Sequence, residues 1–335
     1  MIPVVAPTAY LLISHGSRDP RPQEAMNRLA ELVRTRLETD SRKVDFGDAG
    51  LDNTGLNDDG RDLEMRPSAV RKAVSPAVSE TDLVMQATGM ATVLTMPEIT
   101  QPKMASKTTP TKASPKVAKC LQRLPHQSKG PLVSEVIVGT ACLELSARTL
   151  SEQIYEFAQR LIAAGVTELK MLPVFLMSGV HEMEDIPAEI RAAKELLGDK
   201  LTLTVCPHLG SHPQIADVLA QRLAAVSGER SLLVAHGSRR PKGNRIIKGL
   251  AKRLNTAVAY WATPPDIETQ VIELMQQGCQ KLTILPYFLF AGGITDAITH
   301  RTEELAERFP KIQFRLLPTL GATHEVAKLA IELIH

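Results

Sequence analysis

The sequence predicts an α/β protein made of two tandem repeats, each a four-stranded parallel sheet with helices on both faces. Short apolar runs alternate with amphipathic segments at the spacing of β-α units. The turn at residues 14–18 (SHGSR) returns at residues 235–239 (AHGSR), and residues 165–190 run parallel to residues 278–303. Self-similarity of this kind indicates a duplicated domain. We therefore expect the chain to contain two copies of one fold.

The first domain, residues 1–228, begins with a strand at residues 10–13, where four apolar residues lead into a polar turn. Behind this turn, Met26, Leu29, Val33 and Leu37 recur at helical spacing and predict a helix. Parallel strands joined by helices need right-handed crossovers, which place helices on both faces of the sheet. Further strands are predicted at 135–142, 168–175 and 201–206, with helices at 150–164, 185–197 and 214–226.

The second domain, residues 229–335, repeats this pattern. Ile247, Leu250 and Leu254 stand as far from His236 as the first three helical residues of the first domain stand from His15. The tetrapeptide at 207–210 (PHLG) also has a counterpart at 318–321 (PTLG). Strands are predicted at 257–261, 281–288 and 313–317, with helices at 267–277, 302–308 and 324–334.

Residues 41–131 differ in character from the rest of the first domain. A run rich in Asp, Asn and Gly is followed by one rich in Pro, Ser, Thr and Lys. The second domain crosses the same gap between residues 254 and 258. Such a composition buries too little apolar surface to offset the entropy of ordering. We expect a low-complexity, disordered insertion with a short helix near residues 68–78, and we interpret its lysines as a solvated face.

Composition excludes several classes of function. A net charge of +2 in 335 residues, with 4% aromatic residues, gives no general basis for binding nucleic acid. The four cysteines are far apart and form no C-x-x-C pair, so neither a disulfide framework nor a zinc or iron-sulfur cluster is indicated. We expect a reducing, cytoplasmic location. Neither a signal peptide nor a membrane-spanning run is visible, so we expect no membrane partner.

Polar residues follow three strands of the first domain. His15 follows the first strand, Glu144 follows the second, and His181 with Glu182 follows the third. Ligands of parallel sheets bind beyond the carboxyl ends of the strands, so these stretches converge on one edge. Two imidazoles and a carboxylate can hold a divalent metal loosely or accept a proton near neutral pH. The alternatives are that His15 caps its turn, that Glu144 is only solvated and that His181 is an exposed loop residue.

The second domain lacks part of this set. Ile294 and Thr295 stand where the first domain has His181 and Glu182. Isoleucine can neither bind a metal nor move a proton. We therefore expect one functional site per chain and a structural role for His236.

Other polar residues have less specific interpretations. We expect His208 and His212 to bond to turns and helix starts, and Glu184 and Asp185 to lie in a first helical turn. Basic residues flank both HGS turns, either as a solvated face or as a basic rim that binds substrate carboxylates. They are Arg18, Arg21, Arg239, Arg240 and Lys242.

The motifs of the first domain resemble a known family. They are SHGSR at 14–18, ACLEL at 141–145, LPVFLMSGVH at 172–181, DIP at 185–187 and PHLG at 207–210. In this order they resemble the class II chelatases, which insert cobalt or ferrous iron into sirohydrochlorin. The resemblance covers both domains outside the insertion. It implies a small α/β domain, used as a homodimer or a tandem fusion, that holds the macrocycle in a cleft.

The resemblance also implies roles for individual residues. His15 and His181 would bind the incoming metal, and His15 would also accept a pyrrole proton. Arg18 would hold substrate carboxylates. The macrocycle would be contacted by Glu144, Leu176, Met177, Ser178, Gly179 and Val180.

The implied function is an ATP-independent sirohydrochlorin chelatase for sirohaem or cobalamin biosynthesis. The divalent metal, Fe2+ or Co2+, is a substrate, and no permanently bound cofactor is expected. The sequence contains no G-x-x-x-x-G-K-[ST] loop for a nucleotide, and it lacks the C-x-x-C motif and His-rich tail of some long relatives. The tandem repeat suggests a monomer that imitates a dimer.

Two other functions stay open. The chain could be a tetrapyrrole or metal carrier that binds without chemistry. It could also be a histidine-nucleophile hydrolase, although Arg18 alone is little for a phosphoryl-transfer site. The ligand types leave the choice among ferrous, cobaltous and nickel ions open. The chelatase hypothesis requires the imidazoles of His15 and His181 to face each other across a hollow that is wide enough for the flat macrocycle.

Overall fold

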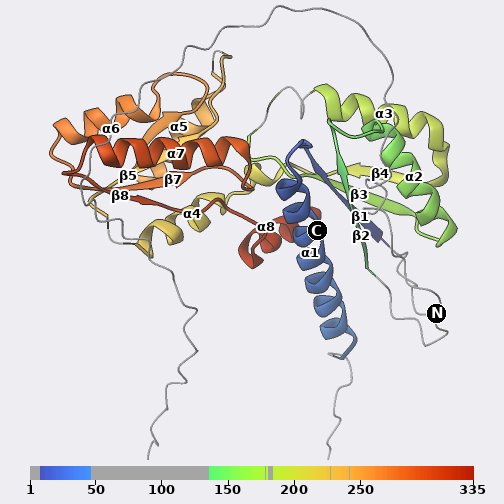
Figure 1. Ribbon diagram of the computed structural model, residues 1–335. Coiled ribbons are helices and arrows are strands. Elements are labelled where there is room, and N and C mark those ends of the chain that lie inside the picture. The colour runs from blue at the N-terminus through green and yellow to red at the C-terminus, as the bar shows by residue number, and fades with distance from the viewer. Residues whose placement is uncertain (1–7, 47–135, 178, 180–183, 227, 241) are drawn as a thin grey trace, which may run out of the picture. The chain divides into compact units, whose positions relative to one another are not determined.

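The computed structural model describes residues 8–46, 136–177, 179, 184–226, 228–240 and 242–335, with only the backbone of 41–46 (Figure 1). Both repeats belong to one compact unit. Residues 47–131 of the predicted insertion, including the helix expected near 68–78, lie outside the described residues.

The first repeat has the predicted order of elements. Its four strands are all parallel and lie in the order β2-β1-β3-β4. Ser14 pairs with Cys142, and Ile13 with Pro173, so the three strand ends reach the same edge. The elements are β1 (Thr8–Ser14), α1 (Pro20–Phe46), β2 (Ile137–Cys142), α2 (Leu150–Ala163), β3 (Glu168–Pro173), α3 (Ile186–Leu197), η2 (Gly198–Lys200), β4 (Thr202–Val205), η3 (Leu209–Ser211) and α4 (Ile215–Ala224).

The second repeat has the same topology, with four parallel strands in the order β6-β5-β7-β8. This equivalence confirms the duplication predicted from the sequence. The elements are β5 (Arg230–Ala235), α5 (Arg245–Leu254), β6 (Ala257–Tyr260), α6 (Ile267–Gln276), β7 (Lys281–Pro286), α7 (Gly293–Arg308), β8 (Gln313–Leu316) and α8 (His324–Ile334).

Two helices are longer than predicted. Helix α7 begins at Gly293 rather than at residue 302, because the Thr295 hydroxyl bonds to the backbone N and O of Gly292 at 2.8 and 2.7 Å and closes the first turn. The paired glycines made this start look like a loop. Helix α1 continues to Phe46, into the segment assigned to the insertion, and Arg36 and Asp40 form an i,i+4 ion pair of 3.0 Å on it.

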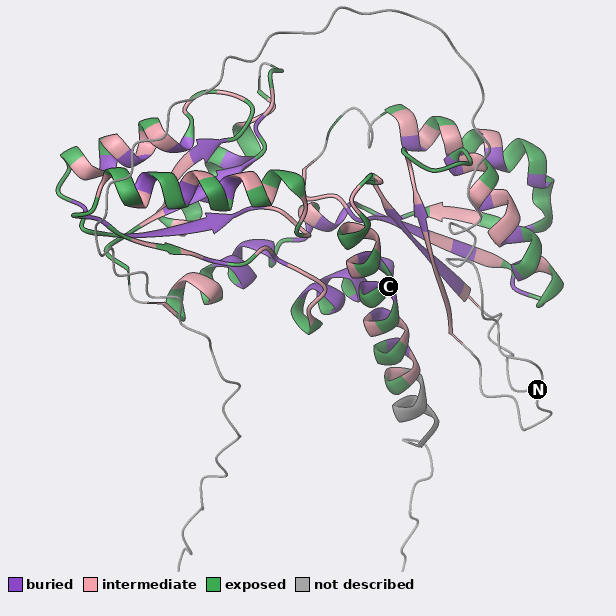
Figure 2. Cartoon of the chain, in the orientation of Figure 1, coloured by how far each residue is buried: buried purple, intermediate pink, exposed green. Residues whose placement is uncertain are grey.

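Strand β1 is buried on both faces. Tyr10 and Leu12 belong to one apolar cluster, whereas Ala9, Leu11 and Ile13 belong to another on the opposite face. A strand that is buried on both faces has apolar residues at successive positions, and this continuous apolar run predicted β1 clearly. Figure 2 shows the buried strands between more exposed helices.

The last helix of each repeat contacts the other repeat. Helix α8 packs against α1 and β3 of the first repeat, and α4 contacts α5 of the second. Lys170 Nζ donates to the carbonyl of Ile334 at 2.9 Å, and Arg253 pairs with Asp217 at 2.7 Å. One large apolar cluster therefore contains residues of both repeats. The boundary at 228/229 separates the two sheets but not their cores.

Each repeat also has a core of its own on the opposite face of its sheet, under α2 and α3 in the first and under α6 and α7 in the second. Among the described residues, Cys142, Cys206 and Cys279 form no disulfide with one another. None of the described helices has the length and apolar character needed to cross a membrane.

The shared core predicts that the two repeats unfold together. Leu12 is fully buried in that core, so Leu12→Ala should lower the free energy of unfolding by about 2–5 kcal/mol. Trp261, the single tryptophan, lies in the second repeat and reports its unfolding by fluorescence. We expect the fluorescence and circular-dichroism transitions in denaturant to coincide and to shift together in the variant. A fluorescence transition that Leu12→Ala leaves unmoved would contradict the shared core.

Candidate functional site

The turn that carries His15 is locked to the turn that carries Glu144. Beyond the last strand pair, Leu143 N donates to Ser14 O and Glu144 N donates to His15 O, both at 2.9 Å. Gly16 has a φ of +98°, and a Cβ on it would lie 2.0 Å from the Glu144 carbonyl oxygen. Only glycine combines this backbone angle with so close an approach. The sequence H-G-S therefore places two reactive side chains beside each other.

His15 and Glu144 meet at the carboxyl edge of the sheet, as predicted. The His15 Nε2 and Glu144 Oε2 atoms are 4.0 Å apart, and both side chains are about half exposed, at 47% and 46%. Among the residues that the structure describes, no group of three or more His, Cys, Asp or Glu side chains could hold a metal.

Phe175 brings the third strand to the same place. Its ring meets the His15 ring edge-on, with centroids 6.5 Å apart and an interplanar angle of 63°. The ends of β1, β2 and β3 thus converge on His15. His181 and Glu182 lie outside the described residues, so the facing of the two imidazoles across a hollow stays a prediction.

The chain leaving β3, residues 174–177, is held by its carbonyl groups; we call it the β3 exit. Phe175 O accepts a bond from Gly210 N at 2.8 Å and lies 3.1 Å from His208 Nδ1. Leu176 O accepts a bond from the Tyr287 hydroxyl at 3.1 Å. A Cβ on Gly210 would lie 2.1 Å from Leu176 O, which explains the glycine of the P-H-L-G turn.

The predicted macrocycle contacts divide into three groups. Leu176 and Met177 are partly buried and pack against the shared core, so part of each side chain is committed to the fold. Gly179 is exposed, with no atom within 4 Å of an added Cβ. Ser178 and Val180 lie outside the described residues.

His208 and His212 have the structural roles expected of them, since both are buried. His212 Nδ1 accepts a bond from Gln214 N at 3.1 Å, and its Nε2 lies 2.9 Å from a Glu332 carboxylate oxygen on α8. The second contact joins the repeats and has no local signal in the sequence.

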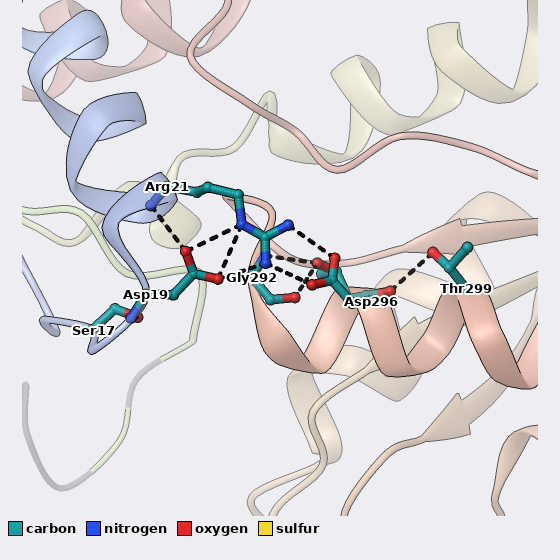
Figure 3. A network of polar contacts seen from close by, with 7 residues as sticks. Ser17, Asp19, Arg21, Gly292, Asp296 and Thr299 are labelled. Atoms are coloured by element: carbon teal, nitrogen blue, oxygen red, sulfur yellow. Dashed lines mark hydrogen bonds and ion pairs between the residues drawn. The ribbon is translucent and has the colours of Figure 1, made fainter.

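The basic rim is a wrong prediction for Arg21. The Nε of Arg21 lies 3.1 and 3.0 Å from the two carboxylate oxygens of Asp19, and its Nη1 donates to Asp296 at 3.0 Å (Figure 3). This pairing holds the pKa of both carboxyls below their ordinary value and raises the pKa of Arg21. Arg21 is therefore neutralised within the protein. The other four residues of the predicted rim are exposed: Arg18, Arg239, Arg240 and Lys242.

The corresponding edge of the second repeat has lost its carboxylate as well. Trp261 N donates to Ala235 O at 2.9 Å and Ala262 N donates to His236 O at 2.8 Å, the same pattern that places Glu144 beside His15. Ala262 is thus the counterpart of Glu144. His236 is exposed, and its Nδ1 lies 2.9 Å from the carbonyl of Gly237. Of His15, Glu144 and His181, only His15 has an identical counterpart in the second repeat, His236.

Sequence reasoning missed Phe175, Tyr287 and Ala262. Phe175 stands one residue before the predicted contact segment, so its place in the L-P-x-F-L motif could have indicated it. Tyr287 was visible as the tyrosine that replaces Val174 in the repeat. Ala262 could not be aligned, because the flanking segments share too little sequence.

Known proteins support the fold and the family. A sirohydrochlorin cobaltochelatase of Priestia megaterium is 24% identical over 205 residues, which cover 56% of this chain and 65% of that protein. A sirohydrochlorin cobaltochelatase of Methanosarcina acetivorans is 34% identical over 96 residues, covering 27% of this chain and 71% of that protein. The matched part therefore spans just under two thirds of the length of the P. megaterium relative.

The solved structure of SirB from Bacillus subtilis with Fe3+ matches with a TM-score of 0.57 at 16% identity, covering 98% of this chain and 94% of that one. This likeness confirms the predicted fold of two tandem chelatase-like domains. The CbiX family model matches residues 113–226 and again residues 230–335. The first match begins after His15, and the second contains His236, which occupies the same place in its repeat. Because the family model matches within both repeats, the chain belongs to the CbiX family.

Proposed function

We propose that the protein is a sirohydrochlorin chelatase that inserts Fe2+ or Co2+ into the macrocycle without ATP, in the formation of sirohaem or cobalamin. The observation that carries the proposal is the convergence of His15, Glu144 and the β3 exit at one sheet edge. The relatives named above are sirohydrochlorin chelatases, which supports the same reaction.

The chemistry needs a group that is both a ligand and a base. Insertion removes two pyrrole N–H protons while the incoming ion exchanges water for ring nitrogens. A neutral imidazole can do both near neutral pH. In this proposal His15 and His181 bind the metal. When the ion passes to the ring nitrogens, the released nitrogen of His15 accepts one pyrrole proton, and the second proton passes to solvent. Glu144 is proposed to contact the macrocycle, and its half-exposed carboxylate, 4.0 Å from His15 Nε2, also to stabilise the positive charge that forms on the His15 ring.

The macrocycle is held by the β3 exit and the residues after it. Leu176, Met177, Ser178, Gly179 and Val180 are proposed to contact the ring, and exposed Arg18 to pair with its carboxylates. The metal is a substrate, so no resident cofactor is needed. Neutralisation of Arg21 by Asp19 and Asp296 weakens the hydrolase alternative, because it leaves fewer arginines for a phosphoryl group.

Replacing either imidazole should stop the reaction. We expect His15→Ala and His181→Ala to lower the rate of metal insertion by about 100-fold or more, since each loses a ligand and His15 also the base. The rate is followed by the absorbance change of sirohydrochlorin with each metal in turn. His236→Ala is the matched control from the second repeat and should keep full activity. Full activity in His181→Ala would overturn the assignment, and stoichiometric binding without turnover by the unaltered chain would favour a carrier.

Removing the charge of Glu144 should slow insertion without unfolding the turn, because its backbone N–H, not its side chain, makes the bond to His15. We expect Glu144→Gln to lower kcat/KM by about 10-fold. Ala262→Glu is the matched control. It restores a carboxylate beside His236 but supplies no second imidazole, so the rate should not change. Unchanged kcat/KM in Glu144→Gln would show that this carboxylate is only solvated.

A further inference from the structure

We infer that the second repeat takes part in the reaction of the first by positioning its substrate segment: Tyr287 holds the Leu176 carbonyl at the β3 exit and so fixes where the macrocycle contacts begin. The inference rests on the proposed function and assigns Tyr287 as a positioning residue. It gives the second repeat, which lacks part of the polar set, a role at the proposed site of the first repeat.

The backbone of Tyr287 is placed by its own repeat. Tyr287 N donates to Val234 O at 2.7 Å, just as Val174 N donates to Ile13 O at 2.7 Å in the first repeat. The two residues are therefore equivalent in the fold and differ in their side chains. Tyr287 is 4% exposed, and its hydroxyl lies 3.1 Å from Leu176 O in the other repeat.

The Tyr287 hydroxyl is a donor at any ordinary pH. Burial raises the pKa of Tyr287, so the group stays protonated. A carbonyl oxygen can only accept, which fixes the direction of the bond. Tyr260 provides a contrast in the same repeat, since its buried hydroxyl has no hydrogen-bond partner in the described part of the chain.

The two repeats satisfy the same carbonyl in different ways. In the second repeat, Leu289 O, the counterpart of Leu176 O, accepts a bond from Gly321 N of the same repeat at 2.6 Å. In the first repeat the equivalent glycine, Gly210, bonds to Phe175 O instead. The carbonyl of Leu176 is thus left to Tyr287. The second repeat therefore holds the β3 exit of the first repeat. The corresponding segment after β7 is held by a hydrogen bond within its own repeat.

This bond acts close to the reacting group. Leu176 follows Phe175, whose ring lies edge-on to the His15 ring, and it precedes the other proposed macrocycle contacts. Loosening the Leu176 peptide would let both the ring beside His15 and the contact segment shift. The expected effect is on macrocycle binding more than on proton transfer, because the Tyr287 hydroxyl bonds to the Leu176 carbonyl and acts through the β3 exit.

The test compares Tyr287→Phe with Tyr260→Phe in the full chain. Tyr287→Phe should raise the KM for sirohydrochlorin by about 2- to 10-fold, the range expected for one lost hydrogen bond, while kcat changes less than about 2-fold. The amide of Gly210, which donates to neighbouring Phe175 O, should exchange faster with solvent deuterium. Tyr260→Phe loses a hydroxyl that has no partner among the described residues, and it should match the unaltered chain in all three measurements.

The outcomes separate this inference from the proposed function. If the unaltered chain inserts no metal, the proposed function fails; Gly210 exchange and macrocycle affinity, measured by quenching of Trp261 fluorescence, then judge the role of Tyr287. If the unaltered chain is active and Tyr287→Phe keeps its KM and its Gly210 exchange, the inference is wrong. Equal changes in both tyrosine variants would show general packing and would also overturn it.

Discussion

The fold depends on one requirement, that a parallel sheet must be covered on both faces. Each repeat covers one face with two of its own helices, α2 and α3 or α6 and α7. The other face is buried in a core that both repeats share, where α8 lies on α1 and β3 of the first repeat. Neither repeat can therefore complete its core alone. This requirement ties the degenerate second half to the half that carries the proposed chemistry.

Backbone hydrogen bonds place the residues of the candidate site beside one another. Hydrogen bonds continue past the ends of β1 and β2 and bring His15 and Glu144 together, with Gly16 allowing the close approach. Phe175 closes the third side from β3. Side chains at the carboxyl ends of neighbouring parallel strands meet by geometry, so the edge can change its chemistry without a change of fold.

The equivalent sheet edge of the second repeat has different chemistry on the same fold. The second repeat keeps the backbone pattern of the turn pair but has Ala262 at the place of Glu144 and Ile294 at the place assigned to His181. Its contacts with the first repeat are polar as well as apolar: Arg222 of α4 donates to two carbonyls of the P-T-L-G turn at 2.7 and 2.6 Å, and Asp296 pairs with Arg21. The second repeat thus lacks the carboxylate and the second histidine of the site, while it still makes hydrogen bonds and ion pairs with the first repeat.

The sequence by itself determined the fold class, the duplication, nearly all strands and helices, and the convergence of His15 and Glu144, because apolar periodicity, turn residues and strand ends are local signals. It could not decide which helix covers which sheet, that Arg21 is neutralised by Asp296, or that Tyr287 reaches Leu176. Those pairings join residues more than a hundred positions apart. They follow from how complete surfaces pack, which no local pattern encodes, and so only the tertiary structure decided them.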